Sequence, residues 1–156
     1  YFKLRDDIGA ELHSEEQVEH DGLDPTPITD AALEAAAQYP NKRLLVHYMH
    51  PHYPYLGETA TGDFDGFDLQ TDGLIGDIQR REVSIPDEVM RQAYVETLDA
   101  VLDEVAKLLE VFEGKTVVSA DHGELLGDRC FPLPVKDYAH HGKLYVEELV
   151  KVPWWA

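Results

Sequence analysis

Cysteine is almost absent from the sequence, which contains Cys130 alone. A single cysteine permits no internal disulfide, so the class of small secreted domains built on disulfides is excluded. No run approaches the roughly 20 apolar residues of a membrane span, and the chain opens without the pattern of a signal peptide. From these absences we expect a cytoplasmic protein that does not span a membrane.

Basic residues are also scarce, since 13 Lys and Arg stand against 31 Asp and Glu and give a net charge of -18. This deficit excludes a general nucleic-acid binder and a domain that docks on anionic membranes. The acidic residues are spread over the whole chain, which is typical of a halophilic protein kept soluble in concentrated salt. The alternative is a solvated acidic face without a special role.

Apolar spacing predicts two helices and two buried strands. Thr26 and Pro27 indicate the start of a first helix, which Pro40 ends. A second helix is predicted from about 86 to 112, where apolar residues recur at spacings of three and four. The predicted strands are 43–49 and 116–120. A strand, a long helix and a strand in this order favour a right-handed crossover and an α/β fold with parallel pairing.

The remaining segments are less regular. We expect a short helix or a surface arm over 1–24, a surface loop over 57–76 and a helical turn over 144–149. With 156 residues and 44% apolar content, the chain is expected to form a single domain or part of one. Within 1–156, residues 1–40 form an N-terminal helical segment and residues 41–156 an α/β core that carries the motifs.

Histidines gather where the predicted strands end. His47, His50 and His52 follow the first strand, and His122 follows the second. In an open α/β sheet, ligand sites form outside the carboxyl ends of the strands. Pro51 favours a bend that presents His52 to an anion or a transferable proton. A zinc site built from these three strand-end histidines alone is less favoured, because their side chains are expected to diverge.

Asp121-His122-Gly123 offers a carboxylate oxygen and an imidazole nitrogen on adjacent residues. Such mixed donors suit a divalent cation. The alternative is a turn in which Asp121 caps the amide of Gly123 or Glu124.

His140-His141-Gly142-Lys143 forms a third group of chemically active side chains. Lys143, in a chain with few lysines, suits contact with an anion. The alternative is an exposed polar loop.

Two other patterns carry no functional prediction. Asp63 to Asp68 looks calcium-like, but its glycine comes too early for an EF-hand loop, so a turn-rich acidic loop is expected. Cys130 lacks a neighbouring motif that activates a thiolate, which favours a structural role.

Taken in order, the motifs resemble the C-terminal portion of the catalytic domain of sulfatases, a family of the alkaline phosphatase superfamily. The resemblance rests on residues 44–55, the helix around Tyr94 and Asp103, residues 116–127 and residues 141–153. It covers most of the chain from about Asn41 onward. It implies an alkaline-phosphatase-like α/β fold with a mixed or mostly parallel sheet and flanking helices, and the acidic bias resembles that of a halophilic archaeal member.

The resemblance also implies a chemistry, the hydrolysis of a sulfate or phosphate ester of a small molecule or glycan. Asp121 and His122 would bind a divalent ion, which is Ca, Mg, Mn or Zn, and His52 would contact the anion and assist the leaving group. His141 and Lys143 would touch the anion or leaving oxygen, with an alignment uncertain by a residue. The ion would act as a Lewis acid on an ester oxygen.

The family's nucleophile and two further acidic metal ligands belong to an N-terminal half that is not found in this sequence. Cys130 does not replace the nucleophile, because it lacks the Cys-x-Pro-Ser-Arg context and follows the Asp-His pair. If the chain is a fragment, we expect its parent to be an active hydrolase; if it is the whole protein, we expect at best poor metal affinity and no turnover. Two other hypotheses remain: a non-catalytic acidic binding domain, and a histidine-rich protein that sequesters metal. The sequence does not indicate an oligomeric state.

Overall fold

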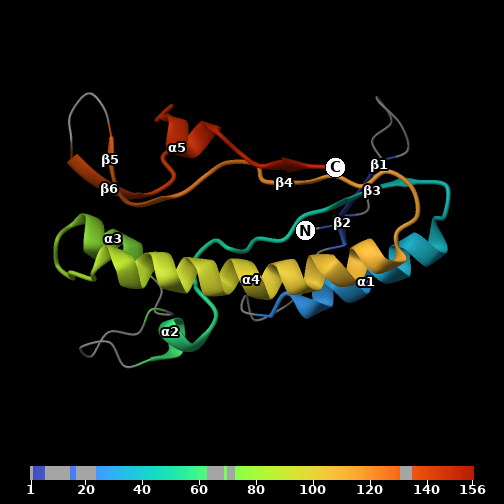
Figure 1. Cartoon of the computed structure of the whole chain (residues 1–156), viewed down its shortest axis with the longest axis horizontal. Coiled ribbons are helices and arrows are strands. Elements are labelled where there is room, and N and C mark those ends of the chain that lie inside the picture. Colours follow the sequence, from blue (N-terminus) through green and yellow to red (C-terminus); the bar gives the residue numbers. More distant parts are fainter. Residues whose placement is uncertain (1, 6–14, 17–23, 63–68, 70–72, 131–134) are drawn as a thin grey trace.

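The computed structural model describes residues 2–5, 15–16, 24–62, 69, 73–130 and 135–156 (Figure 1). The calcium-like stretch 63–68 lies outside the described residues. The chain forms helices and strands in mixed order, as predicted for its general class. The elements are β1 (Phe2–Arg5), β2 (Glu15–Glu16), α1 (Thr26–Gln38), β3 (Arg43–Val46), α2 (Glu58–Thr61), α3 (Leu74–Gln79), α4 (Asp87–Val111), β4 (Val118–Ser119), β5 (Leu125–Cys130), β6 (Val135–Ala139), α5 (Glu147–Val150) and β7 (Trp154–Trp155).

Helix α4 is the axis of the molecule and runs along its length (Figure 1). Its buried residues recur at helical spacing: Met90, Ala93, Thr97, Val101, Glu104 and Leu108. The first half of this stripe contacts a cluster that includes α2, α3 and the buried Tyr55, while the last turns contact α1 and β3. Both long helices occupy their predicted positions, because periodic apolar residues define the face that a helix buries.

The sheets are small, and every ladder among the described strands is antiparallel. Strand β3 pairs with β1 over its whole length, in the register Phe2↔Val46 to Arg5↔Arg43, and β2 pairs with the other edge of β1. Strand β4 pairs with β7, and β5 pairs with β6. The predicted parallel pairing of the segments before and after α4 is not among these ladders. Strand β3 pairs with β1 and strand β4 pairs with β7 instead, each in an antiparallel ladder.

Five local predictions need correction. The 116–120 strand is reduced to β4, and it is not buried as predicted, since Val117 and Ser119 are exposed. The 43–49 strand is shorter and less buried than predicted, since it ends at Val46 and the Leu45 side chain is 58% exposed. The 57–76 segment includes α2 and the start of α3, with Ala60 and Leu74 buried in the core. The 1–24 segment contributes two strands rather than a helix, and the 144–149 turn is a helix shifted to 147–150.

The β5–β6 hairpin is fastened to the start of α4 by polar contacts. Arg91 Nη2 lies 2.6 Å from Asp128 Oδ1, and the Tyr138 hydroxyl donates to Asp87 Oδ1 at 2.8 Å. Lys136 forms an ion pair with the same Asp87 carboxylate. Burial, followed by the Asp87 carboxylate, raises the pKa of Tyr138 to about 12, so the phenol stays protonated and able to donate. These contacts hold both ends of the hairpin over α4.

Asp87→Asn is expected to weaken this attachment. The hydrogen bond from Lys136, opposed by partial desolvation and helped by Tyr138, lowers the pKa of the Asp87 carboxyl below its ordinary range. The folded state therefore binds fewer protons than the unfolded chain, so the stabilisation is complete above the ordinary pKa and is lost as the pH falls through the lower folded value. We expect a loss of about 1 kcal/mol of unfolding free energy at neutral pH.

Denaturant unfolding of the wild type and the variant at pH 7 and pH 3 measures this effect. The difference between the two proteins is expected to shrink at the lower pH. A constant difference would contradict the assigned role of the Asp87 carboxylate.

In the described part of the chain, none of the helices is long and apolar enough to cross a membrane.

Candidate metal and anion site

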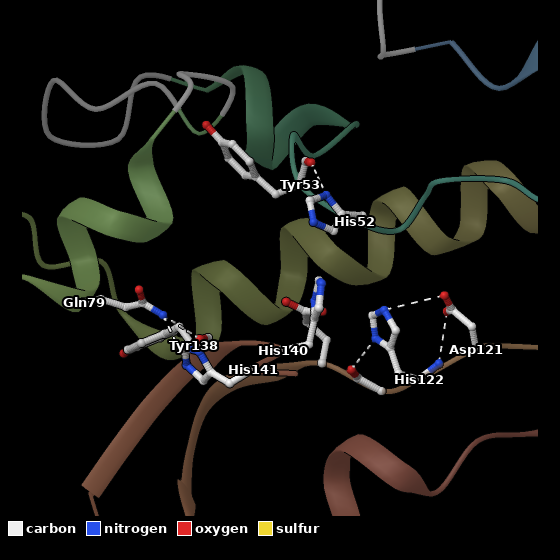
Figure 2. A network of polar contacts seen from close by, with 10 residues as sticks. His52, Tyr53, Gln79, Asp121, His122, Tyr138, His140 and His141 are labelled. Atoms are coloured by element: carbon white, nitrogen blue, oxygen red, sulfur yellow. Dashed lines mark hydrogen bonds and ion pairs between the residues drawn. The ribbon is translucent and has the colours of Figure 1, made fainter. Parts of the chain in front are cut away.

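Three segments that are distant in the sequence meet beside helix α4 (Figure 2). His52 comes from the segment after β3, His122 from the loop between β4 and β5, and His140 from the residue that follows β6. Glu124 lies directly before β5. The antiparallel pairing of β5 with β6 explains why Glu124 and His140 converge, because it places the start of β5 and the end of β6 side by side, with Leu125 opposite Ala139.

The three histidine rings form a contiguous group. The centroids of the His122 and His140 rings lie 4.1 Å apart with an interplanar angle of 34°. The His52 ring meets the His140 ring edge-on at 5.3 Å. Figure 2 shows His52 above His140 and His122 beside it. His140 is therefore the central member of the group.

Each ring has its Nδ1 atom next to an acceptor. His122 Nδ1 lies 2.9 Å from the Gly123 carbonyl oxygen, and His52 Nδ1 contacts the carbonyl oxygen of Tyr53. His140 Nδ1 lies 2.7 Å from Glu124 Oε2. Carbonyl and carboxylate oxygens accept hydrogen bonds, so each of these contacts is a hydrogen bond in the tautomer that carries the proton on Nδ1. In the neutral rings, Nε2 is then the atom with a free lone pair, which is the arrangement that metal-binding histidines adopt.

Asp121 flanks this group on the side of β4. Its Oδ1 atom accepts the His122 amide at 3.0 Å, rather than the amide of Gly123 or Glu124 that the predicted turn requires. Its Oδ2 atom lies 3.6 Å from His122 Nε2 and 4.0 Å from His47 Nε2. Two ligands of a tetrahedral zinc ion lie roughly 3.4 Å apart when each is about 2.1 Å from the metal. The spacing of Asp121 and His122 is therefore compatible with a shared cation.

A second set of candidate metal ligands surrounds His140, the central ring of the group. His122, Glu124 and His140 each offer one ligand atom, and these atoms all lie within 4.8 Å of one another. Two imidazoles and one carboxylate form one of the ligand sets that hold catalytic zinc. All three side chains are partly buried rather than fully exposed. The residues present thus fit a divalent ion.

Glu124 adds a negative charge to the histidine group, and its side chain is largely shielded from solvent. The Glu124 side chain is 13% exposed. Burial first, and then the charge of Glu124, raises the pKa of the phenols of Tyr94 and Tyr55 beneath it. Among the described residues, the ion-pair partner of Glu124 is His140. A carboxylate in these surroundings favours the approach of a cation.

The other predicted site residues lie apart from this cluster. His141 Nε2 lies 3.1 Å from Asp137 Oδ1 and 3.5 Å from Gln79 Nε2, on the side of α3. Lys143 is exposed in the turn that follows, where the Leu144 amide bonds to the His141 carbonyl. The structure therefore gathers His52 and His122 with His140 rather than with His141.

Glu124 was not predicted as a functional side chain. The sequence offered one signal, its position next to Asp-His-Gly, but only its backbone amide was considered there. The proximity of Glu124 to His140 depends on the pairing of β5 with β6, in which residues 16 positions apart become neighbours. Sequence spacing alone does not show such a pair.

Cys130 has no features of an activated nucleophile. Desolvation, followed by the charges of Asp137 and Glu148, raises the pKa of its thiol above the ordinary value. This environment disfavours the thiolate, which is the reactive form. The predicted structural role of Cys130 agrees with this electrostatic environment.

Comparison with known proteins identifies no relatives. No protein-family model matches the chain, and no curated protein or solved structure is significantly similar to it.

Proposed function

We propose that this chain supplies the divalent-metal and anion site of a sulfatase-like hydrolase of sulfate esters. One observation carries the proposal: two segments that bear the resemblance to sulfatases, around His52 and His122, meet in one cluster through His140, the residue directly before the last resembling segment. The helices and ladders described above would then form part of an alkaline-phosphatase-like catalytic domain. The parent protein would be the active enzyme.

The cluster supports distinct roles for its side chains. His122 and His140 would hold the ion together with an acidic oxygen from Asp121, with Glu124 beside them, and the bound ion would act as a Lewis acid on an ester oxygen. His52, edge-on to the His140 ring, would donate a proton to the anion or the leaving oxygen when its ring is doubly protonated. By the resemblance, Lys143, which lies apart from the cluster, would contribute positive charge for the anion.

The donor set favours zinc over calcium or magnesium. Imidazole nitrogens suit zinc and similar transition metals, whereas calcium and magnesium are bound almost entirely by oxygen. Sulfate and phosphate esters share a tetrahedral geometry, so the same side chains also fit a phosphate or phosphonate ester. The second candidate function is therefore hydrolysis of those esters at the same site.

Metal binding is tested by adding zinc, manganese, magnesium or calcium to the metal-free protein and measuring thermal unfolding and heats of binding. A ligand that binds only the folded state at 100 times its Kd stabilises that state by about 2.7 kcal/mol. We expect zinc to produce such a shift and Asp121→Ala to remove it. Asp137→Ala is the matched control, because Asp137 contacts His141 outside the cluster.

If none of the ions changes the melting temperature, the metal site is refuted and the histidines are structural, as in a non-catalytic acidic domain. Several weak sites, each little affected by Asp121→Ala, would instead fit a metal-sequestering protein. Hydrolysis of 4-nitrophenyl sulfate and 4-nitrophenyl phosphate by the parent protein then distinguishes the two ester classes. Absence of turnover with either ester would contradict the hydrolase proposal.

A further inference from the structure

Glu124 is the residue of the cluster whose role is least obvious, because it admits two uses. As a direct ligand it would give an oxygen to the ion. As a positioning residue it would hold the His140 ring and determine which nitrogen carries the proton. Both uses fit the grouping of His122, Glu124 and His140.

The geometry points to the second use. Glu124 Oε2 lies 2.7 Å from His140 Nδ1, which is the distance of a charge-assisted hydrogen bond. The same carboxylate is only 13% exposed, so bulk water competes weakly for it. A buried oxygen already engaged by an N–H group is less free to turn toward an ion.

Neighbouring rings restrict His140 further. The His122 ring lies 4.1 Å from one side of it and the His52 ring meets it at 5.3 Å (Figure 2). With Nδ1 held by Glu124, rotation of the ring about its axis would sacrifice that bond, so Nε2 keeps one direction. In His122 and His52, backbone carbonyls engage the same atom, Nδ1.

We infer that Glu124 is a positioning residue that keeps His140 in the Nδ1–H form, so that His140, like His122, presents Nε2 as its donor atom. The inference rests on the proposed function. It deepens that function because it assigns the binding of the ion to imidazole Nε2 atoms. Carboxylates that hold a ligating histidine in this way typically account for 10–100-fold in metal affinity.

The chain offers a matched comparison pair. Asp137 Oδ1 contacts His141 Nε2 at 3.1 Å, so a second carboxylate engages a neighbouring histidine outside the cluster. Glu124→Ala removes the acceptor from His140, whereas Asp137→Ala removes the acceptor from His141. Glu124→Gln keeps an amide oxygen that is able to accept from Nδ1 but loses the charge that a metal-binding carboxylate provides.

The first measurement is made on the metal-free protein labelled with ¹⁵N-histidine. Long-range ¹H–¹⁵N correlation spectra report which ring nitrogen is protonated, and His140→Gln assigns the His140 signals. We expect His140 to be Nδ1–H in the wild type and in Glu124→Gln, and to leave that form in Glu124→Ala. Asp137→Ala is expected to change the signals of His141 alone.

The second measurement is zinc affinity by calorimetry, with melting curves to confirm that each variant folds. We expect Glu124→Ala to lose about 10–100-fold and Glu124→Gln less than about 10-fold. Equal losses in both variants would identify Glu124 as a direct ligand and overturn the inference. An Nε2–H form of His140 in the wild type, or an unchanged His140 spectrum in Glu124→Ala, would also overturn it.

The two proposals fail in different ways. If the wild type binds no zinc but the His140 spectra respond to Glu124 as expected, the metal function fails and the positioning of His140 stands. If zinc binds with the expected affinity but the His140 spectrum is unchanged in Glu124→Ala, only the positioning role of Glu124 is refuted. Should Glu124→Ala not fold, Glu124→Gln and the wild-type spectrum still decide between the two uses of Glu124.

Discussion

Gly123→Ala is expected to lower the melting temperature of the protein by roughly 10 °C, which corresponds to a few kcal/mol in a chain of this size. A Cβ atom at position 123 would overlap the backbone carbonyl oxygen of Glu148, at a separation far below the 3.0 Å that real Cβ atoms respect. Backbone atoms on both sides leave no flexible side chain to move away. The Gly123 amide also donates to the Leu149 carbonyl at 2.9 Å, and this bond would stretch.

The estimate combines two costs. Overfilling a close contact costs about 1–3 kcal/mol, and the weakened hydrogen bond adds about 1 kcal/mol. Since Gly123 joins the His122 loop to the helix α5, zinc binding is expected to decline together with stability. Thermal unfolding in the absence and presence of zinc measures both effects.

Gly142→Ala is the matched control for this substitution. Gly142 also lies beside a histidine, but an added Cβ there meets nothing within 4 Å. We expect a change in unfolding free energy within about 0.5 kcal/mol. If the two alanine variants melt at the same temperature, the close approach of the 123 loop to α5 is wrong.

His122→Ala is expected to reduce zinc affinity by more than about 100-fold, or about 2.8 kcal/mol of binding free energy. His122 faces Asp121 through Nε2 and stacks beside His140, so its loss affects both candidate groups of donors. Removing a metal ligand is expected to reduce zinc affinity by more than the roughly 10–100-fold that follows from removing a residue that supports a ligand. The His122 side chain is 39% exposed, so the fold is expected to survive the substitution.

His141→Ala distinguishes this expectation from a general effect of removing histidines. The His141 side chain is comparably exposed and contacts Asp137, outside the cluster. We expect it to leave zinc affinity unchanged within about threefold, which is less than 1 kcal/mol. If both variants lose the same zinc affinity, the ion does not bind at the proposed cluster. If neither variant loses zinc affinity, neither histidine is a metal ligand.

The long helices were predictable from the sequence, whereas the pairing of the strands was not. The 26–38 and 87–111 helices follow from local signals, namely the prolines at their starts and the spacing of their apolar residues. Strand partners depend on contacts between distant segments. The 1–24 segment has little apolar pattern, yet it contributes β1, which pairs with β3.

The candidate site was predictable only in part, because some of its residues carry local signals and others depend on contacts between distant segments. His52 and His122 stand out as histidines that follow strand-like segments, and the structure brings both to one cluster. The choice between His140 and His141 was not predictable. Adjacent residues at the end of β6 point in different directions, so His140 turns toward Glu124 and His141 toward Asp137.

The sequence by itself determined an acidic chain with one cysteine, two long helices and a small number of histidine-bearing segments. These properties follow from composition and from periodicities within a few turns of chain, which need no knowledge of distant contacts. Only the tertiary structure decided that Glu124 meets His140, and that Gly123 touches α5. The first pair forms because β5 and β6 are paired with Leu125 opposite Ala139, and the second because the loop before β5 packs on the backbone of α5. The donor atoms of the site are therefore set by packing between segments rather than by any local motif.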